Sequence, residues 1–240
     1  MKTKIKALRI LKTKIMSKTT ILFFISMIVI GIMSCKKENT AAPQVPEVFP
    51  PIDIDGNVYD TVRIGTQVWM VQNLMTKHYN DGTPITTDLG NASWENTTSG
   101  AYAIYDDVNS NAIVYGYLYN WYAVSSGKLA PKGWHVPSEA EFNTLVDNLG
   151  GITNAGCSLK STTLWTTPNF CATNFSGFRA RPGGGRGGIG GAYSEKGNMA
   201  YFWSANSSIS TVYRLRYNES DVQFSTAFKN SGLSVRCLKD

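Results

Sequence analysis

Histidine, cysteine and long apolar runs are scarce in this chain of 240 residues. Neither His78 nor His135 has cysteines or acids at the spacing of a zinc motif, so no zinc site is predicted. No grouping of nucleophile, base and acid stands out, which favours a protein without catalytic activity. The longest apolar run, residues 21–33, is too short for a permanent membrane-spanning helix. The length suits one domain with tails.

Acidic residues are absent from the first 35 positions, where seven of the 23 basic residues lie. The rest of the chain has 16 basic and 17 acidic residues, a formal net charge of −1. The overall charge of +6 therefore belongs to the leader, and binding to nucleic acid is not expected. Residues 1–34 combine a basic start, an apolar run and small or polar residues, which is the pattern of a secretory signal peptide.

Cys35 ends this leader in the sequence Ile32-Met33-Ser34-Cys35. The ending resembles the lipobox of bacterial lipoproteins, in which the cysteine is acylated and becomes the new N-terminus. An ordinary signal peptide with a coincidental cysteine is the alternative. Lys36 stands where aspartate marks inner-membrane retention, so the resemblance implies an outer-membrane lipoprotein on the cell surface or the periplasmic face. Residues 35–51 then form the lipidated cysteine and a proline-rich tether to the membrane.

Residues 52–240 are rich in Tyr, Trp, Gly, Asn, Ser and Thr and are expected to form one strand-dominated domain. Alternating segments on either side of Gly65-Thr66 predict a β-hairpin, with strands in residues 58–64 and 67–73. Residues 78–100 are polar and full of turn signals, so loops are expected there. Residues 115–124 are almost continuously aromatic or apolar and predict a buried short helix or strand.

A helix is predicted after Pro137, because Ser138 and Glu141 form a capping box. Apolar residues then recur at helical spacing until Gly150-Gly151, so Glu139 and Glu141 are interpreted as structural residues. Three or four strands are expected toward the C-terminus, in residues 199–204, 212–217, 222–228 and 233–238. In residues 213–217 apolar and basic residues alternate, which predicts a buried face and a face that shows arginines. Cys237 is expected in the core.

Seven segments in order resemble the Fibrobacter succinogenes major paralogous domain family of bacterial secreted proteins and lipoproteins: VRIGTQVWMVQNL, YGYLYNWYAV, LAPKGWHVPSEAEF, LKSTTLW, NFSGFRARPGG, YFWSAN and LSVRCLKD. The resemblance implies an α+β fold similar to C-type lectins, with mostly antiparallel strands, one or two short helices and long loops. A more distant similarity, carried by residues 134–142, is to the formylglycine-generating, sulfatase-modifying family. Those enzymes use a close pair of reactive cysteines, whereas Cys157, Cys171 and Cys237 are far apart in sequence.

Disulfide pairing is expected in an oxidising compartment. A bridge between Cys157 and Cys171 would close a short polar loop and leave Cys237 as a free thiol, and a pairing that involves Cys237 is the alternative.

A mobile surface loop is predicted for the glycine-rich residues 183–191. Their G-x-G-x-x-G pattern has no following helix, so a nucleotide site is not predicted. In lectin-like folds ligands bind at long loops of this kind. Arg179, Arg181 and Arg186 are therefore candidates to bind carboxylate or sulfate, and Tyr193 and Trp203 are candidates to stack on a sugar. The alternative is that the arginines lie on a solvated loop and Trp203 lies in the core.

These patterns predict no cofactor, but a calcium ion is a possible ligand of one short stretch. Asp106, Asp107 and Asn109 offer oxygen atoms in a short stretch, although the glycine and the closing glutamate of an EF-hand are missing. A turn that caps itself is the alternative.

These patterns together predict a lipid-anchored envelope domain that binds a glycan or an envelope protein without catalysis. The two other hypotheses are an enzyme on a formylglycine-generating scaffold and a structural component of an envelope assembly or adhesin.

Overall fold

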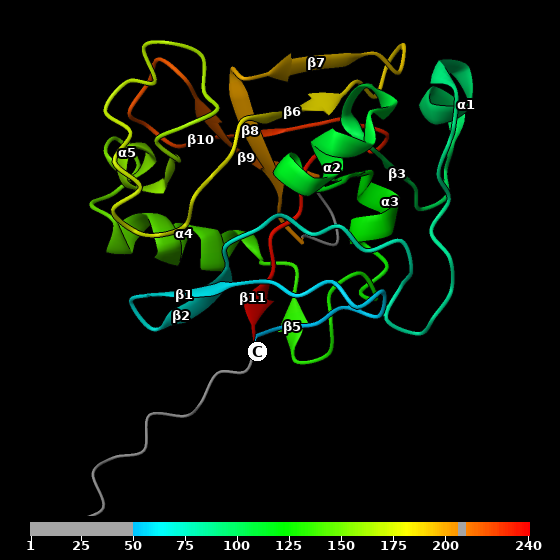
Figure 1. Ribbon diagram of the computed structural model, residues 1–240, viewed down its shortest axis with the longest axis horizontal. Helices are drawn as coiled ribbons and strands as arrows, with labels where there is room; N and C mark the ends of the chain where they lie inside the picture. Colours follow the sequence, from blue (N-terminus) through cyan, green and yellow to red (C-terminus); the bar gives the residue numbers. More distant parts are fainter. Residues whose placement is uncertain (1–49, 206–209) are drawn as a thin grey trace, which may run out of the picture. The chain divides into compact units, whose positions relative to one another are not determined.

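A computed structural model of the chain describes residues 50–205 and 210–240 (Figure 1). The expected signal peptide, Cys35 and nearly all of the tether lie outside the described residues. Among the helices of the described part, none combines the length and the apolar character needed to cross a membrane.

The described residues form an α+β fold, as predicted, with short helices and several small antiparallel sheets. The helices are α1 (Asn91–Asn96), α2 (Asn109–Tyr115), α3 (Trp121–Val124), α4 (Glu139–Asn148) and α5 (Ala155–Leu159), with a 3-10 helix at Tyr105–Asp107. The strands are β1 (Thr61–Ile64), β2 (Gln67–Met70), β3 (Tyr102–Ala103), β4 (Leu118–Tyr119), β5 (Trp134–His135), β6 (Gly183–Arg186), β7 (Tyr193–Lys196), β8 (Met199–Trp203), β9 (Thr211–Arg216), β10 (Gln223–Thr226) and β11 (Leu238–Lys239).

One sheet joins the two ends of the described domain, in the order β1-β2-β11-β5. The predicted hairpin is confirmed, because β1 pairs with β2 across Gly65-Thr66. Gly65 has a φ of 59°, a value that favours glycine in a tight turn. The C-terminal strand β11 lies between β2 and β5 (Figure 1). The C-terminal strand of the described domain is therefore held beside its first hairpin.

Helix α4 has the predicted capping box. The Ser138 hydroxyl accepts a hydrogen bond from the Glu141 backbone N–H, and the Glu141 carboxylate accepts from the Ser138 N–H at 2.8 Å. Phe142, Leu145 and Val146 form its buried face, as their helical spacing indicates.

The aromatic segment 115–124 contains both a strand and a short helix, the two alternatives that its pattern left open. It runs from the end of α2 through β4 into α3, and its residues are largely buried. Asn120 makes the change possible, because its side chain accepts hydrogen bonds from the backbone N–H groups of Ala101 and Ala123. One buried amide thus caps α3 and fixes the neighbouring chain.

Three predictions of local structure were wrong. The polar segment 78–100 contains helix α1, because Trp94 is completely buried and anchors it. Residues 183–186 form the buried strand β6 and not a surface loop. In residues 233–238 only isolated bridges precede β11, since Leu233 and Ser234 each bind a different neighbouring segment.

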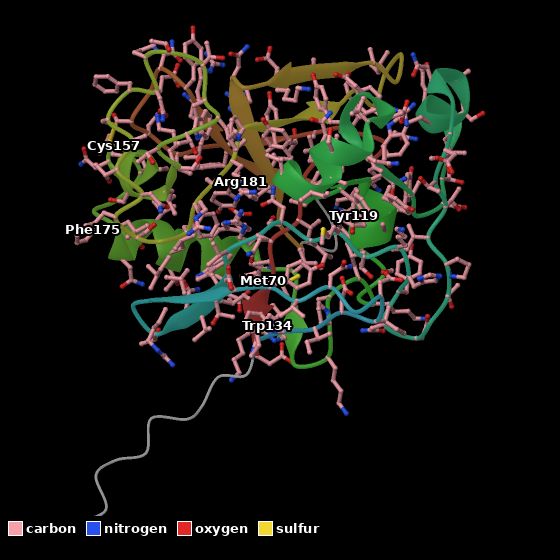
Figure 2. All side chains as sticks on the ribbon, viewed as in Figure 1. Met70, Tyr119, Trp134, Cys157, Phe175 and Arg181 are labelled. Carbon is pink, nitrogen blue, oxygen red and sulfur yellow. A yellow bond between two sulfur atoms is a disulfide. The ribbon has the colours of Figure 1, made fainter. Side chains whose placement is uncertain are left out.

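Two large clusters form the core. One gathers around Trp203, Tyr119 and Cys237, and the other lies between α4 and the sheet β10-β9-β8 around Trp69 and Phe202. Met70 and Tyr119 lie in the interior in Figure 2. Cys237 is a buried free cysteine, as predicted.

Candidate functional site

The structure does not bring the five predicted ligand-binding residues together. Trp203 is completely buried, and its indole N–H donates a hydrogen bond of 2.7 Å to the Tyr119 carbonyl. No ligand at the surface can stack on it, so Trp203 is corrected to a core residue.

Arg186 is also buried, with 3% of its surface exposed. Its guanidinium carbon lies 4.5 Å from the ring centre of Trp94 and 4.9 Å from that of Tyr193. The same group donates to the carbonyls of Gly191, at 2.9 Å, and Leu89, at 2.7 Å. These contacts occupy the side chain and give Arg186 a structural role, although it also lines the hollow described below, so ligand binding by Arg186 stays a prediction. Arg186 holds α1 against the β6–β7 hairpin.

Arg181 and Arg179 lie near one another but differ in exposure. Arg181 is half-buried and donates a hydrogen bond of 2.5 Å to the Val114 carbonyl, whereas Arg179 is exposed. Burial and the nearby charge of Arg179 lower the pKa of Arg181. Figure 2 shows Arg181 well inside the outline of the domain. Tyr193 lies instead beside Arg186, its partner across the β6–β7 hairpin.

The calcium candidates are engaged by other side chains. The Asp106 carboxylate lies 3.6 Å from the Lys196 ammonium, and Asp107 accepts a hydrogen bond of 2.6 Å from the Tyr193 hydroxyl. Asn109 begins helix α2. Within residues 50–205 and 210–240, no group of three or more His, Cys, Asp or Glu side chains could hold a metal ion.

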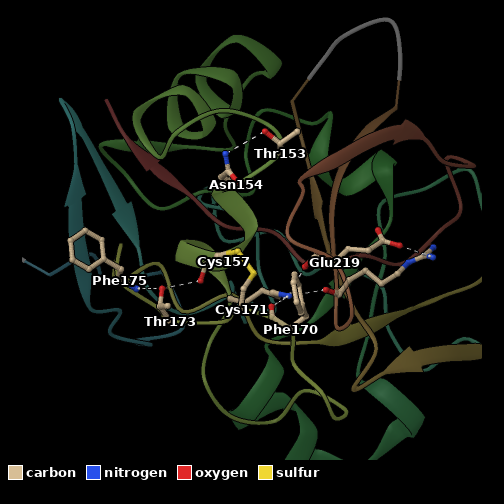
Figure 3. Close-up of a disulfide and its surroundings, with 10 residues drawn as sticks. Thr153, Asn154, Cys157, Phe170, Cys171, Thr173, Phe175 and Glu219 are labelled. Carbon is tan, nitrogen blue, oxygen red and sulfur yellow. Dashed lines mark hydrogen bonds and ion pairs between the residues drawn. A yellow bond between two sulfur atoms is a disulfide. The ribbon is translucent and has the colours of Figure 1, made fainter.

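Cys157 and Cys171 form a disulfide bond, as predicted (Figure 3). The remaining described cysteine, Cys237, is completely buried, and burial raises the pKa of its thiol. The described residues therefore contain no close pair of free thiols.

A groove lies between the β6–β7 hairpin and one face of the sheet β10-β9-β8. Its first hollow has a volume of about 250 Å³. Hydroxyl groups are prominent in its wall, which also includes Tyr201 and Arg214; the hydroxyl residues are Ser194, Ser225, Thr226 and Ser231. A second hollow of about 260 Å³ is lined by Tyr201, Arg216, Glu195, Asn198 and Asn218, among others. Because Tyr201 lines both hollows, they adjoin.

Strand register explains why these residues gather. Tyr201 in β8 pairs with Arg214 in β9, and Gln223 in β10 pairs with the same arginine. Paired residues of antiparallel strands point to the same face of a sheet, and residues two apart on one strand also share a face. Tyr201, Arg214 and Arg216 are therefore presented together on the side that faces β6 and β7.

Arg214 is the least satisfied polar group of the groove. Its Nε atom is buried and has no hydrogen-bond partner among the described residues. Arg216, in contrast, pairs with Glu219 at 3.3 Å. A buried donor without a partner is unfavourable, and the guanidinium of a residue that lines the hollow is a group that binds anions.

The charged groups of the groove act on the pKa of Tyr201. Burial raises the pKa of its phenol, and the charge of Glu195 raises it further, while Arg214 and Arg216 oppose these effects. The phenol therefore stays neutral and can donate a hydrogen bond at physiological pH. The alternation in residues 213–217 did predict an arginine-bearing face, but nothing in the sequence placed Tyr201 beside it.

The family comparison agrees with the sequence resemblance. The family model of the Fibrobacter succinogenes major domain matches residues 62–239. The chain belongs to this family. No curated protein and no solved structure matches the chain. The similarity to C-type lectins and to the formylglycine-generating family stays a prediction.

Proposed function

We propose that this protein is a non-catalytic, lipid-anchored domain of the outer membrane that binds a glycan or protein ligand in the groove beside Tyr201. The single observation that carries the proposal is that Arg214, whose buried Nε has no hydrogen-bond partner among the described residues, lines the first hollow. The leader with Cys35 and the proline-rich tether of residues 35–51 support an anchored, outward-reaching domain. The C-type-lectin-like fold implied by the family would suit recognition of a glycan.

Two hollows of about 250 and 260 Å³ form the proposed site. Each is smaller than a typical pocket for a drug-sized ligand, which has about 300 to 1,000 Å³. A ligand that fills the groove therefore spans both hollows and passes Tyr201. This shape suits a chain of small units better than one compact molecule.

Binding of the purified protein to a broad glycan array, with calcium and then with a chelator, tests the proposal. We expect binding to one class of glycan, with loss of signal in Tyr201→Ala and Arg214→Gln. Arg63→Gln is the matched control, because Arg63 is an exposed arginine on β1, in another sheet. Binding that survives both groove substitutions would refute the groove as the site. Loss in chelator would return attention to Asp106 and Asp107.

The anchor has its own test. Cells that express the protein should incorporate labelled palmitate into it, and Cys35→Ser should abolish the incorporation. Labelling that persists in the variant would contradict the lipid anchor.

A structural role in an envelope assembly is the second candidate. The exposed apolar side chains favour it, above all Phe175, of which 87% is exposed, at the edge of the domain in Figure 2. Stoichiometric partners in a pull-down from membranes, lost in Phe175→Ser, would support it. An oxidase of the formylglycine-generating kind is not proposed, because the bridge between Cys157 and Cys171 leaves no reactive pair in the described residues.

A further inference from the structure

The two hollows of the groove differ in charge. The first contains Arg186, which donates to backbone carbonyls, and Arg214, which has no acidic partner within 4.0 Å among the described residues. The second contains Arg216, which is already paired with Glu219, and it also contains Glu195. The first hollow therefore attracts an anionic group, whereas an anionic group in the second would meet the carboxylate of Glu195.

The remaining lining groups indicate the kind of molecule that fits. The second hollow offers the Glu195 carboxylate and the amides of Asn198 and Asn218, which suit the hydroxyl and amide groups of a neutral sugar. The first offers hydroxyl side chains around the guanidinium. Between the hollows, the half-buried Tyr201 ring presents an apolar face and a polar tip, and such a ring packs well on a sugar.

A peptide ligand fits these walls less well. An extended peptide gains affinity from the backbone groups of a strand edge, and β8 and β9 are each paired along the groove floor. Peptide side chains also need apolar pockets as anchors. The lining of the second hollow is mainly polar, whereas that of the first is polar and apolar in about equal parts, with Val212, Ala227 and Leu233 as its aliphatic contacts.

From these observations we infer that the ligand is an acidic glycan, in which a sugar that carries a carboxylate or sulfate binds at Arg214 and an adjacent neutral sugar binds beside Glu195. This inference rests on the proposed function, because it names the ligand class of the same groove. Arg214 serves as the anion-binding residue, Tyr201 as the platform between the two sugars, and Glu195 as the group that requires the second sugar to be neutral.

The test uses isothermal titration of the purified protein with defined tetrasaccharides. Hyaluronan tetrasaccharide alternates glucuronate with a neutral amino sugar, and its carboxyl-reduced form is the neutral control of equal size. A sulfated, carboxyl-reduced chondroitin tetrasaccharide separates sulfate from carboxylate. We expect at least one acidic form to bind tenfold or more tightly than the neutral form, the effect expected of a charge-assisted hydrogen bond.

Arg214→Gln should weaken binding of the acidic form at least tenfold and so remove the preference for it, while Arg63→Gln, with the same change of charge, should keep the preference. Glu195→Gln should improve binding of a tetrasaccharide of galacturonate, which is acidic in every sugar. Thermal unfolding of each variant checks that it is folded. Comparing the native protein and Arg214→Gln, each with the acidic and the neutral tetrasaccharide, isolates the contact between the arginine and the acid.

Equal affinity for acidic and neutral forms would overturn the inference, yet it would leave glycan binding in the groove intact. Arg214-dependent binding of hexaglutamate without binding of any tetrasaccharide would overturn it in favour of an acidic peptide. Failure of every acidic tetrasaccharide would also overturn it. The proposed function would fall separately, if no array ligand depended on Tyr201 or Arg214.

Discussion

The ammonium group of Lys160 donates a hydrogen bond of 2.9 Å to the carbonyl of Phe170, the residue before Cys171. The lysine is completely buried and also donates to the carbonyls of Arg216, at 3.0 Å, and Glu219, at 2.7 Å. It thereby ties the disulfide-bonded segment to the end of β9 (Figure 3), the strand that carries Arg214.

Replacing Lys160 with methionine should destabilise the domain strongly. The apolar stem is kept, but three carbonyls lose their donor, so the free energy of unfolding should fall by about 3 kcal/mol or more. Urea denaturation measures the change, with the exposed Lys132→Met as control. A decrease of less than about 1 kcal/mol in the free energy of unfolding would mean that water replaces the ammonium group at little cost.

Removing the disulfide should have a similar effect. Cys157 and Cys171 lie 14 positions apart in the sequence, and a loop of this size predicts a loss of about 3 kcal/mol in the double Cys→Ser variant. The bridge and Lys160 hold the same segment, so combining the variants should cost less than the sum of the separate losses. Strict additivity in denaturation curves would show that the two ties act independently.

Arg186→Lys should lower stability. Lysine lacks the planar fork that reaches Leu89 and Gly191, so a loss of about 2 kcal/mol is expected. Arg179→Lys, at an exposed arginine, should leave the unfolding midpoint unchanged. Full stability of Arg186→Lys together with lost glycan binding would support the prediction of a ligand-binding arginine.

His135 should make stability depend on pH. Burial lowers the pKa of its imidazole, but hydrogen bonds to Asp240, at 2.7 Å, and Glu141, at 3.0 Å, more than offset this, and the net pKa is raised. A raised folded pKa adds stability that is complete below the unfolded value of about 6.5 and is lost as pH rises through the folded value.

The side chain is 37% exposed, so solvent screening limits this contribution to below about 1 kcal/mol. Urea denaturation at pH 5.5 and at pH 8.5 should show a larger advantage of the native protein over His135→Gln at the lower pH. Subtracting the variant cancels the contributions of the other titrating groups. The same advantage at both values would contradict the assigned pairs.

The groove itself could be predicted only in part. The alternation in residues 213–217 indicated an exposed face with Arg214 and Arg216, since a strand turns successive side chains to opposite sides. It could not indicate that β8 places Tyr201 opposite Arg214 or that the β6–β7 hairpin forms the other wall. Those relationships depend on the pairing and packing of separate strands.

The sequence by itself determined the features that neighbouring residues control: the capping box at Ser138, the turn at Gly65, and the family to which the chain belongs. Only the tertiary structure decided the fate of Arg186, whose nearest partners include Leu89, 97 positions away. The glycines of residues 183–185 have no side chains whose pattern could indicate burial. The burial of this segment depends on its pairing in the β6–β7 hairpin and on the contact of Arg186 with Trp94. Local hydrogen bonds depend on adjacent residues and can be predicted from them. The burial of an arginine depends instead on which distant aromatic rings the fold brings to it.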